Sequence, residues 1–231
     1  MRIIRIYLIS FVLMLVAMIR LSAQEIDVPN YQLIRQQTTN SKLPSYYPRL
    51  MERYVQSDST LSLEDYRCLY YGFTLREDFV PYQMEKQQLF EMRRKLIESK
   101  GKLEVCADAI RTAKSILNDN PFDIPALSVI SIAYLQMGDS LNYRLWDVKQ
   151  QGLLDAISSS GDGETPESAF HVISVEHEYE ILNRLGLELE NDSIVSPKVE
   201  YLRVKPNAES IEGLYFNFDA CVSIYRKKYE L

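Results

Sequence analysis

Both histidines of the chain lie in one short stretch, His171 to His177, together with the carboxylates Glu176 and Glu178. Imidazole and carboxylate groups bind zinc and carry protons in general acid–base catalysis. The stretch contains neither H-E-x-x-H nor H-x-H, and a predicted strand-to-helix change places the two histidines on different elements. We therefore predict no catalytic, metal-binding or cofactor-binding residues here. We expect a hydrogen-bonded His171 and a solvent-exposed, glutamate-rich helix start.

Other motifs that carry chemistry are also missing from the sequence. The glycine-rich stretch 161–163 lacks the lysine of a phosphate-binding loop and precedes a predicted strand, where such a loop needs a helix. The G-x-S-x-G motif of hydrolases is also absent from the sequence. Cys68, Cys106 and Cys221 are odd in number and widely spaced, so at most one disulfide can form. We interpret Cys68 and Cys106 as small buried residues on helix faces.

Tyrosine is unusually frequent, with 16 residues against 8 Phe and 1 Trp. Two N-terminal segments concentrate it and supply a candidate interaction surface, consisting of Tyr46, Tyr47, Tyr70, Tyr71 and Phe73. Tyrosine suits such a surface because its ring gives rigid, amphipathic contact area. The alternative, which we favour, is that these rings pack half-buried between helices with their hydroxyls at the surface.

The first 23 residues are typical of an export signal. Arg2 and Arg5 precede an apolar run from Ile6 to Ile19, and small residues end at Ala23. The run is shorter than the roughly 20 residues that cross a bilayer, so we predict cleavage near Ala23 and no stable membrane insertion afterwards. The protein is then periplasmic or secreted. An uncleaved anchor is the alternative, because Arg20 directly follows the run.

The charge balance excludes one class of partner. The chain has 26 Lys and Arg against 32 Asp and Glu, a net charge of −6, and contains no basic run. Nucleic-acid binders carry clustered positive charge, so we do not expect a nucleic acid as partner.

Residues 24–157 are predicted to be mainly helical after a polar lead-in that ends at Leu43. Apolar residues recur at helical spacing in the segments 46–56, 62–73, 83–100, 106–117, 125–137 and 140–157. Ser62 with Asp65 three residues later is typical of a helix start. The segment around Ala113 and Pro121 resembles a tetratricopeptide repeat (TPR). Since such arrays need about three repeats, we expect a TPR-like helical layer that leans on other elements.

The pattern changes after residue 157. Flexible turn formers predict a linker over 158–168. The remaining predicted elements are a strand at 169–175, a helix at 176–185, strands at 198–205 and 213–218, and a helix from Asp219. The fold is therefore predicted as α+β, with a helical layer followed by a small mixed β-α-β-β-α part over 169–231. We expect the two parts to pack as one unit.

Several segments, taken in order, resemble one secreted family of Bacteroidetes-type bacteria, domain of unknown function 4919. They are the leader, Leu69–Phe73, Asn120–Pro121, Gly161–Gly163, Thr165–Phe170, Val172–Ile173, Glu178–Tyr179 and Tyr215–Phe216. The resemblance implies an exported protein, helical in front and mixed at the back. It implies no assigned activity and supplies no catalytic residues.

These patterns favour an exported, non-enzymatic interaction or scaffold protein that binds a protein or peptide partner. The alternative is a cell-envelope hydrolase or glycan-acting enzyme with a cleft between the two parts. For that enzyme, the residues to test are Glu164, His171, Glu176, His177 and Glu178. Carboxylates that converge within roughly 5–9.5 Å in a pocket would favour the enzyme, and carboxylates spread over a solvated face would favour the scaffold.

Overall fold

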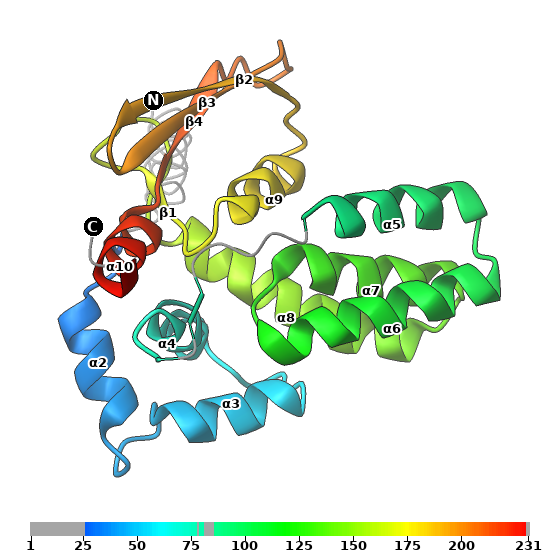
Figure 1. Cartoon of the computed structure of the whole chain (residues 1–231), viewed down its shortest axis with the longest axis horizontal. Helices are drawn as coiled ribbons and strands as arrows, with labels where there is room; N and C mark the ends of the chain where they lie inside the picture. Colours follow the sequence, from blue (N-terminus) through cyan, green and yellow to red (C-terminus); the bar gives the residue numbers. More distant parts are fainter. Residues whose placement is uncertain (1–25, 78, 81–85, 230–231) are drawn as a thin grey trace, which may run out of the picture.

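The computed structural model describes residues 26–77, 79–80 and 86–229 (Figure 1). Within these residues, nine helices and one four-stranded sheet confirm the predicted α+β fold, with the helical layer ahead of the sheet. The helices are α2 (Tyr31–Thr39), α3 (Tyr47–Val55), α4 (Leu63–Phe73), α5 (Lys86–Ser99), α6 (Leu103–Asp119), α7 (Ile124–Gln136), α8 (Ser140–Ser158), α9 (Glu176–Arg184) and α10 (Asp219–Tyr229). The strands are β1 (Phe170–His171), β2 (Leu189–Ser196), β3 (Val199–Val204) and β4 (Gly213–Asn217). The predicted signal peptide, residues 1–23, lies outside the described residues.

The sequence pattern misses two elements, α2 and β2. In α2 only two residues are buried and one of them is a threonine, so no apolar stripe marks the helix. In β2 residues 190–195 are all exposed, because the strand lies at the sheet edge and pairs only with β3. The strand predicted over 169–175 is reduced to β1. The chain leaves the sheet at Ile173, whose amide donates to the Tyr70 hydroxyl at 3.2 Å.

Helix α8 is the centre of the helical layer. Helix α4 packs against one side of α8 and α7 against another, and α6 and α5 follow beyond α7 (Figure 1). The predicted start of α4 is confirmed, since Ser62 and Asp65 form a reciprocal capping box. Gly152 lets α4 approach α8 closely, because a Cβ atom there would lie 2.2 Å from the Tyr66 ring.

Gly152→Ala should destabilise the protein by about 2 kcal/mol, because the added methyl group displaces the Tyr66 ring. Helix propensity alone would predict a gain of about 1 kcal/mol at this position inside α8. Chemical denaturation distinguishes the two effects. The matched control is Gly138→Ala, where a Cβ meets nothing within 4 Å and only the φ of +73° costs about 1 kcal/mol. A Gly152→Ala protein more stable than the wild type would contradict the close packing.

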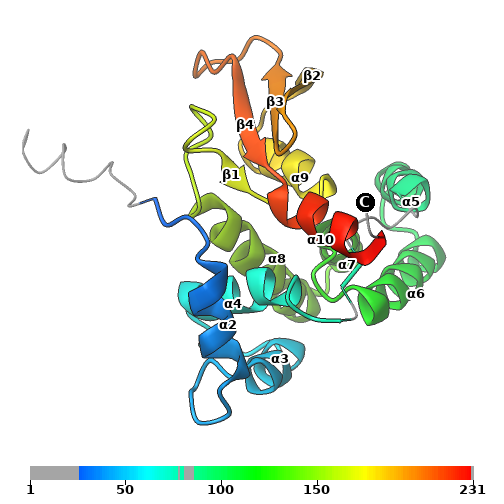
Figure 2. The same cartoon turned by 60° about the vertical axis from the view of Figure 1, so that its left-hand side comes forward.

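The strands form one sheet in the order β1-β4-β3-β2. Strand β1 pairs with β4 in parallel, and the other neighbours are antiparallel. The alternation over 213–218 predicts Leu214, Phe216 and Phe218 on one face, and all three are buried. They belong to the same hydrophobic core as Ile181 and Leu182 of α9. Figure 2 shows α9 beside the sheet and α10 directly after β4.

This hydrophobic core continues from the helical layer into the sheet. It contains Tyr70 and Tyr71 of α4, Leu153 of α8, and Phe170 and Phe216 of two neighbouring strands. A second group of buried residues, which includes Ala109, Ala113 and Cys106, packs α6 against α5 and α7. The prediction that Cys68 and Cys106 are buried helix residues is confirmed.

The predicted linker, residues 158–168, is packed at its start. Ser160 is completely buried, and its hydroxyl accepts the His171 amide at 2.8 Å. A Cβ atom on Gly161 would lie 2.2 Å from the Ser168 carbonyl oxygen, so the turn closes tightly on itself. Residues 164–167 are exposed. The two halves are therefore joined by a packed turn rather than by a loose connection.

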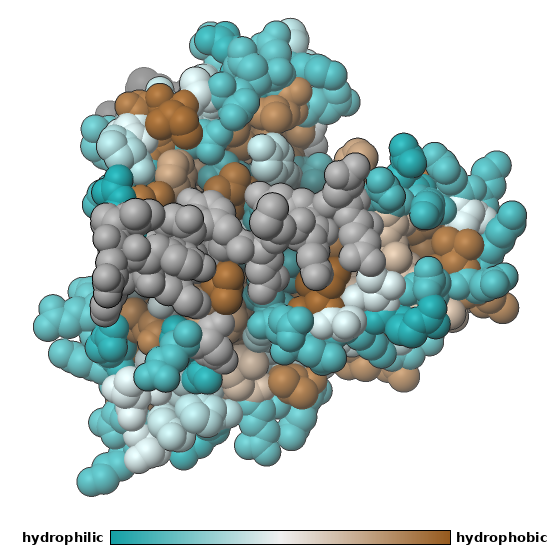
Figure 3. All heavy atoms as spheres, viewed as in Figure 1, coloured by the Kyte–Doolittle hydropathy of each residue, from teal (hydrophilic) through white to brown (hydrophobic). Residues whose placement is uncertain are grey.

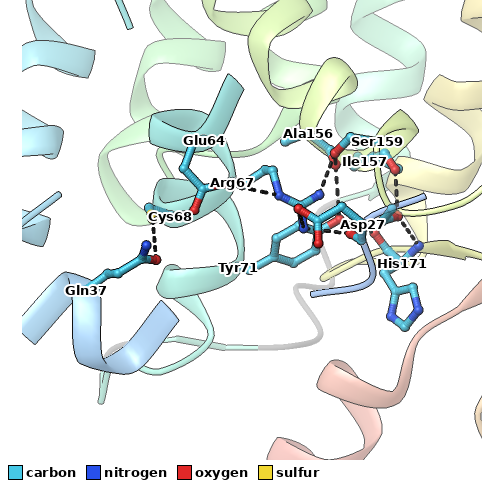
Figure 4. Close-up of polar contacts among 11 residues, drawn as sticks. Asp27, Gln37, Glu64, Arg67, Cys68, Tyr71, Ala156, Ile157, Ser159 and His171 are labelled. Carbon is cyan, nitrogen blue, oxygen red and sulfur yellow. Dashed lines mark hydrogen bonds and ion pairs between the residues drawn. The ribbon is translucent and has the colours of Figure 1, made fainter. Parts of the chain in front are cut away.

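The beginning of the described chain is held by a buried arginine (Figure 4). Arg67 of α4, whose side chain is 6% exposed, donates to the Asp27 carbonyl at 2.6 Å and to the Ser159 hydroxyl at 2.5 Å. Its guanidinium also lies 3.1 Å from the Asp27 carboxylate and 5.6 Å from the centre of the Tyr71 ring. The Asp27 amide donates to the Ser159 carbonyl at 3.0 Å. Asp27 is thus fixed to both α4 and the end of α8.

Candidate functional site

The tyrosine-rich residues proposed as an interaction surface are mostly in the core. Tyr70 and Tyr71 are 0% exposed, Tyr47 and Phe73 are also buried, and only Tyr46 is partly exposed. This corrects the expectation of an exposed surface at these positions. It also corrects the expectation of half-buried rings with hydroxyls at the surface.

The hydroxyls of Tyr47 and Tyr71 point inward, where they donate to backbone carbonyls. Tyr71 donates to the carbonyls of His171 at 3.2 Å and Ala156 at 3.3 Å, and Tyr47 donates to the Leu69 carbonyl at 3.4 Å. Burial raises the pKa of the Tyr71 hydroxyl well above its ordinary value. Tyr71 therefore stays a neutral donor that joins α4 to α8 and β1 (Figure 4).

His177 is part of a buried hydrogen-bond chain. The Tyr70 hydroxyl accepts the Ile173 amide at 3.2 Å and lies 2.7 Å from His177 Nδ1. The hydroxyl proton is therefore available for Nδ1, and a hydrogen bond with the backbone of Phe122 opposes the effect of burial on the pKa of the imidazole. Burial lowers the pKa of His177 to about 4. The imidazole is a neutral link between α4, α9 and the turn after α6.

Of the five residues proposed for an enzyme, Glu176 and His177 line one groove and the other three do not. Glu164 lies in an exposed turn, His171 lies on β1, and Glu178 is completely buried. The expectation of a solvent-exposed helix start is therefore wrong at Glu178. Among the described residues, no group of three or more His, Cys, Asp or Glu side chains is placed to hold a metal ion.

A groove of about 880 Å³ lies between α5 and α9, and we call it the α5–α9 groove. Phe90, Arg93 and Ile97 of α5 form one wall, and Glu176, Tyr179 and Glu180 of α9 form the other. Among the described residues, Phe79, Val80, the α6–α7 junction and segment 173–175 also line the groove. Figure 3 shows the surface hollowed between the sheet and the arm that carries α5.

The groove exposes large apolar side chains. Phe90 is 71% exposed and Ile97 59% exposed, and Val80 and Tyr179 are also exposed. Beneath them, Val129 and Ile173 are buried and provide an apolar base. Mostly apolar hollows of this size with a few polar groups are typical of binding sites.

The polar groups of the groove are mainly charged. Arg93 pairs with Glu180 at 3.0 Å, and the Glu180 side chain is only 6% exposed. Burial raises the pKa of Glu180, although Arg93 opposes the shift. Glu176 lies one helical turn before Glu180 on the same lining, so their Cβ atoms are about 5–6 Å apart.

A second hollow of about 610 Å³ lies beside the N-terminal helices. Tyr46, Tyr47, Thr38 and Arg76 are among its lining residues, and the Arg76 guanidinium lies 5.2 Å from the centre of the Tyr47 ring. Two of the five tyrosine-segment candidates thus border a hollow, but it is smaller and more open to solvent than the α5–α9 groove.

The sequence pattern identifies α5 but assigns one groove residue to the wrong face. Helical spacing predicts one inward face of Leu89, Met92, Leu96 and Ile97; the structure buries the two leucines and partly buries Met92, but it exposes Ile97. A second stripe marks the groove wall, since Phe90, Arg93 and Ile97 follow at spacings of three and four. Glu180 carries no comparable signal, because its partner Arg93 is far away in the sequence.

The described residues define a class of protein: a helical layer fused to a small mixed sheet, with an apolar, charge-bordered groove where α5 faces α9. The model of the family described as Domain of unknown function (DUF4919) matches residues 32–227, so the chain belongs to this family. No curated protein and no solved structure matches the chain. In the part of the chain that the structure describes, no helix is long and apolar enough to span a membrane.

Proposed function

We propose that the chain is an exported, non-enzymatic interaction protein whose α5–α9 groove binds an apolar segment of a protein or peptide partner. The exposure of Phe90 and Ile97 on one wall of the groove carries this proposal. Covering such side chains is worth about 2 kcal/mol each. Because these side chains lie over a buried apolar base, a partner that enters the groove covers them and gains this binding free energy.

Export and the architecture of the helices are further parts of the proposal. We propose cleavage near Ala23 and a periplasmic or secreted location, on the pattern of residues 1–23. We also propose that α6 and α7 are a TPR-like pair, because small residues such as Ala109 and Ala113 are buried between neighbouring helices. No nucleic acid or cofactor is part of the proposed function.

A photoreactive amino acid placed at Phe90 or at Tyr179 should crosslink to the same partner segment in cells. The two positions lie on opposite walls of the groove, so a segment bound between the walls touches both. Gel shift and mass spectrometry of the adducts identify the crosslinked segment. The matched control is Leu141, which is also 71% exposed but lies on α8 outside the groove lining.

The Leu141 control shows whether crosslinking depends on the exposure of the side chain or on its position in the groove. An equal yield of the same adduct at Leu141, or unrelated adducts from the two walls, would contradict a groove-bound segment. A partner found at only one wall would place the interaction outside the groove.

A cell-envelope hydrolase or glycan-acting enzyme is the second candidate function. One observation favours it: Glu176 and Glu180 line the same groove, one turn apart on α9. Against it, Glu180 is already paired with Arg93, and His177 is bonded to Tyr70. Glycan cleavage by the purified protein that Glu176→Gln abolishes would favour this candidate over the first.

A further inference from the structure

We propose that Tyr70 positions the α9 wall of the α5–α9 groove from within the core, through its hydroxyl. This inference rests on the proposed function and adds the residue that keeps the binding surface in shape. Tyr70 belongs to α4 and is not among the described residues that line the groove.

The Tyr70 hydroxyl contacts two residues that do line the groove. It accepts the Ile173 amide at 3.2 Å and lies 2.7 Å from Nδ1 of His177. The centres of the Tyr70 and His177 rings are 5.6 Å apart, so the two side chains also pack against each other. All three residues are at most 2% exposed. One buried hydroxyl therefore joins α4 to two neighbouring parts of the groove lining.

The Ile173 amide bonds to this hydroxyl because the sheet ends just before it. The Val172 amide still donates to the Asn217 carbonyl at 2.9 Å and so continues the pairing of β1 with β4. After Ile173 the chain runs through segment 173–175, which lines the groove, directly into α9. Tyr70 thus holds this segment at the point where it leaves the sheet.

His177 carries the same constraint into α9. It is the second residue of the helix, and a hydrogen bond with the backbone of Phe122 joins it to the turn after α6 as well. Tyr179 follows two residues later and is exposed on the groove wall. Because both residues lie within one turn of a hydrogen-bonded helix, a shift of His177 also moves Tyr179.

A wall that is already in place strengthens binding, since the partner does not have to order it. Without the Tyr70 hydroxyl, the Ile173 amide and His177 each lose a buried hydrogen-bond partner, and the lining is free to take up other arrangements. The apparent affinity then falls by the fraction of molecules in which the groove keeps its binding shape.

The neighbouring tyrosine provides a matched control. Tyr71 is also 0% exposed, and its hydroxyl donates to the carbonyls of Ala156 and His171. Neither of these is among the described residues of the groove lining. Tyr70→Phe and Tyr71→Phe each remove one buried hydroxyl from α4 and should both lower the stability, but only Tyr70→Phe should affect the groove.

An amphipathic peptide tests the inference on the full chain. It has leucine and phenylalanine on one face and glutamine on the other, and fluorescence anisotropy gives its Kd. We expect Tyr70→Phe to weaken binding of the peptide about fivefold and Tyr71→Phe to leave the Kd unchanged. Phe90→Ser should also weaken binding, which shows that the peptide occupies the groove.

Fluorine NMR separates the positioning of the wall from a general loss of stability. A 3-fluorotyrosine in place of Tyr179 reports on the α9 wall, and a 4-fluorophenylalanine in place of Phe90 reports on the α5 wall. Tyr70→Phe should shift or broaden the signal of the α9 wall and leave that of the α5 wall in place. Tyr71→Phe should change neither signal.

The outcomes distinguish the two proposals. An unchanged Kd or an unchanged signal of the α9 wall in Tyr70→Phe would overturn the positioning role and leave the binding groove intact. Equal effects of the two tyrosine variants would also overturn this role, because lost stability would then explain both. A peptide that does not bind, or that ignores Phe90→Ser, would overturn the binding groove, and the fluorine signal would then decide the positioning role by itself.

Hydrogen exchange of the wild-type chain tests the same contact if Tyr70→Phe does not fold. The Ile173 amide should exchange about 100-fold more slowly than an exposed amide, because the Tyr70 hydroxyl accepts it within the core. Exchange of the Ile173 amide as fast as that of exposed amides would overturn the proposal.

Discussion

A chain that ends after Gly163 should not form a cooperatively folded helical domain. The fragment 24–163 retains α2 to α8 but loses Phe170 and Phe216, which share the core with Tyr70 and Tyr71. It also loses the partners of the tyrosine hydroxyls, namely the His171 carbonyl, the Ile173 amide and His177. Exposed aromatic surface and buried donors without acceptors then favour a molten or aggregating state.

Circular dichroism during heating measures this result. We expect one sharp transition for the whole chain, and a broad transition or none for the fragment, which should also bind a hydrophobic dye. A fragment that melts sharply at the temperature of the whole protein would show two independent domains. In that case the core shared by the two halves would contribute little to stability.

Acid should weaken the fold through its two histidines. Burial lowers the pKa of both His171 and His177 from 6.5 to about 4 in the folded chain. Each histidine therefore stays neutral while the unfolded chain takes up a proton below pH 6.5. The stabilising contribution is complete above pH 6.5 and is lost as the pH falls towards 4. For the completely enclosed His177 the loss amounts to about 3 kcal/mol.

Urea unfolding at a series of pH values measures this loss. His177→Gln should lower the free energy of unfolding at pH 7 and flatten its decline between pH 6.5 and 4, because glutamine does not titrate in this range. The His171→Gln, His177→Gln double variant has no histidine and should flatten the decline further. The buried carboxyls of Glu180 and Glu200 have raised pKa values and act in the opposite direction, stabilising the fold as the pH falls. They are the same in all variants, so an unchanged decline in the double variant would contradict the role of the histidines.

Local signals predict most of the helices and three of the strands, of which β1 is shorter than predicted. Ser62 and Asp65 mark the start of α4, and alternation marks the buried face of β4, because these signals depend on neighbouring residues. The burial of Tyr70 and Glu178 has no local signal. Tyr70 is enclosed by His177 and Ile173, more than 100 positions away in the sequence, and sequence periodicity does not report such partners.

The candidate site was predicted less well than the fold, for the same reason. The groove forms where α5 meets α9, and the two helices are separated by α6, α7, α8 and β1 along the chain. The sequence pattern assigns Ile97 to the buried face of α5, and it does not show what lies opposite Phe90. The pairing of Arg93 with Glu180 becomes visible only when both helices are in place.

The attachment of Asp27 by Arg67 determines from which side of the protein a tether can leave. Whatever is joined upstream of Asp27 must depart from the junction of α4 and the end of α8. In both cartoon views, α2 and the start of the described chain lie on one side of the molecule and α5 lies on the other (Figures 1 and 2). A protein held through its N-terminal end, on a biosensor surface or by a fused carrier, would therefore still present the α5–α9 groove to a partner in solution.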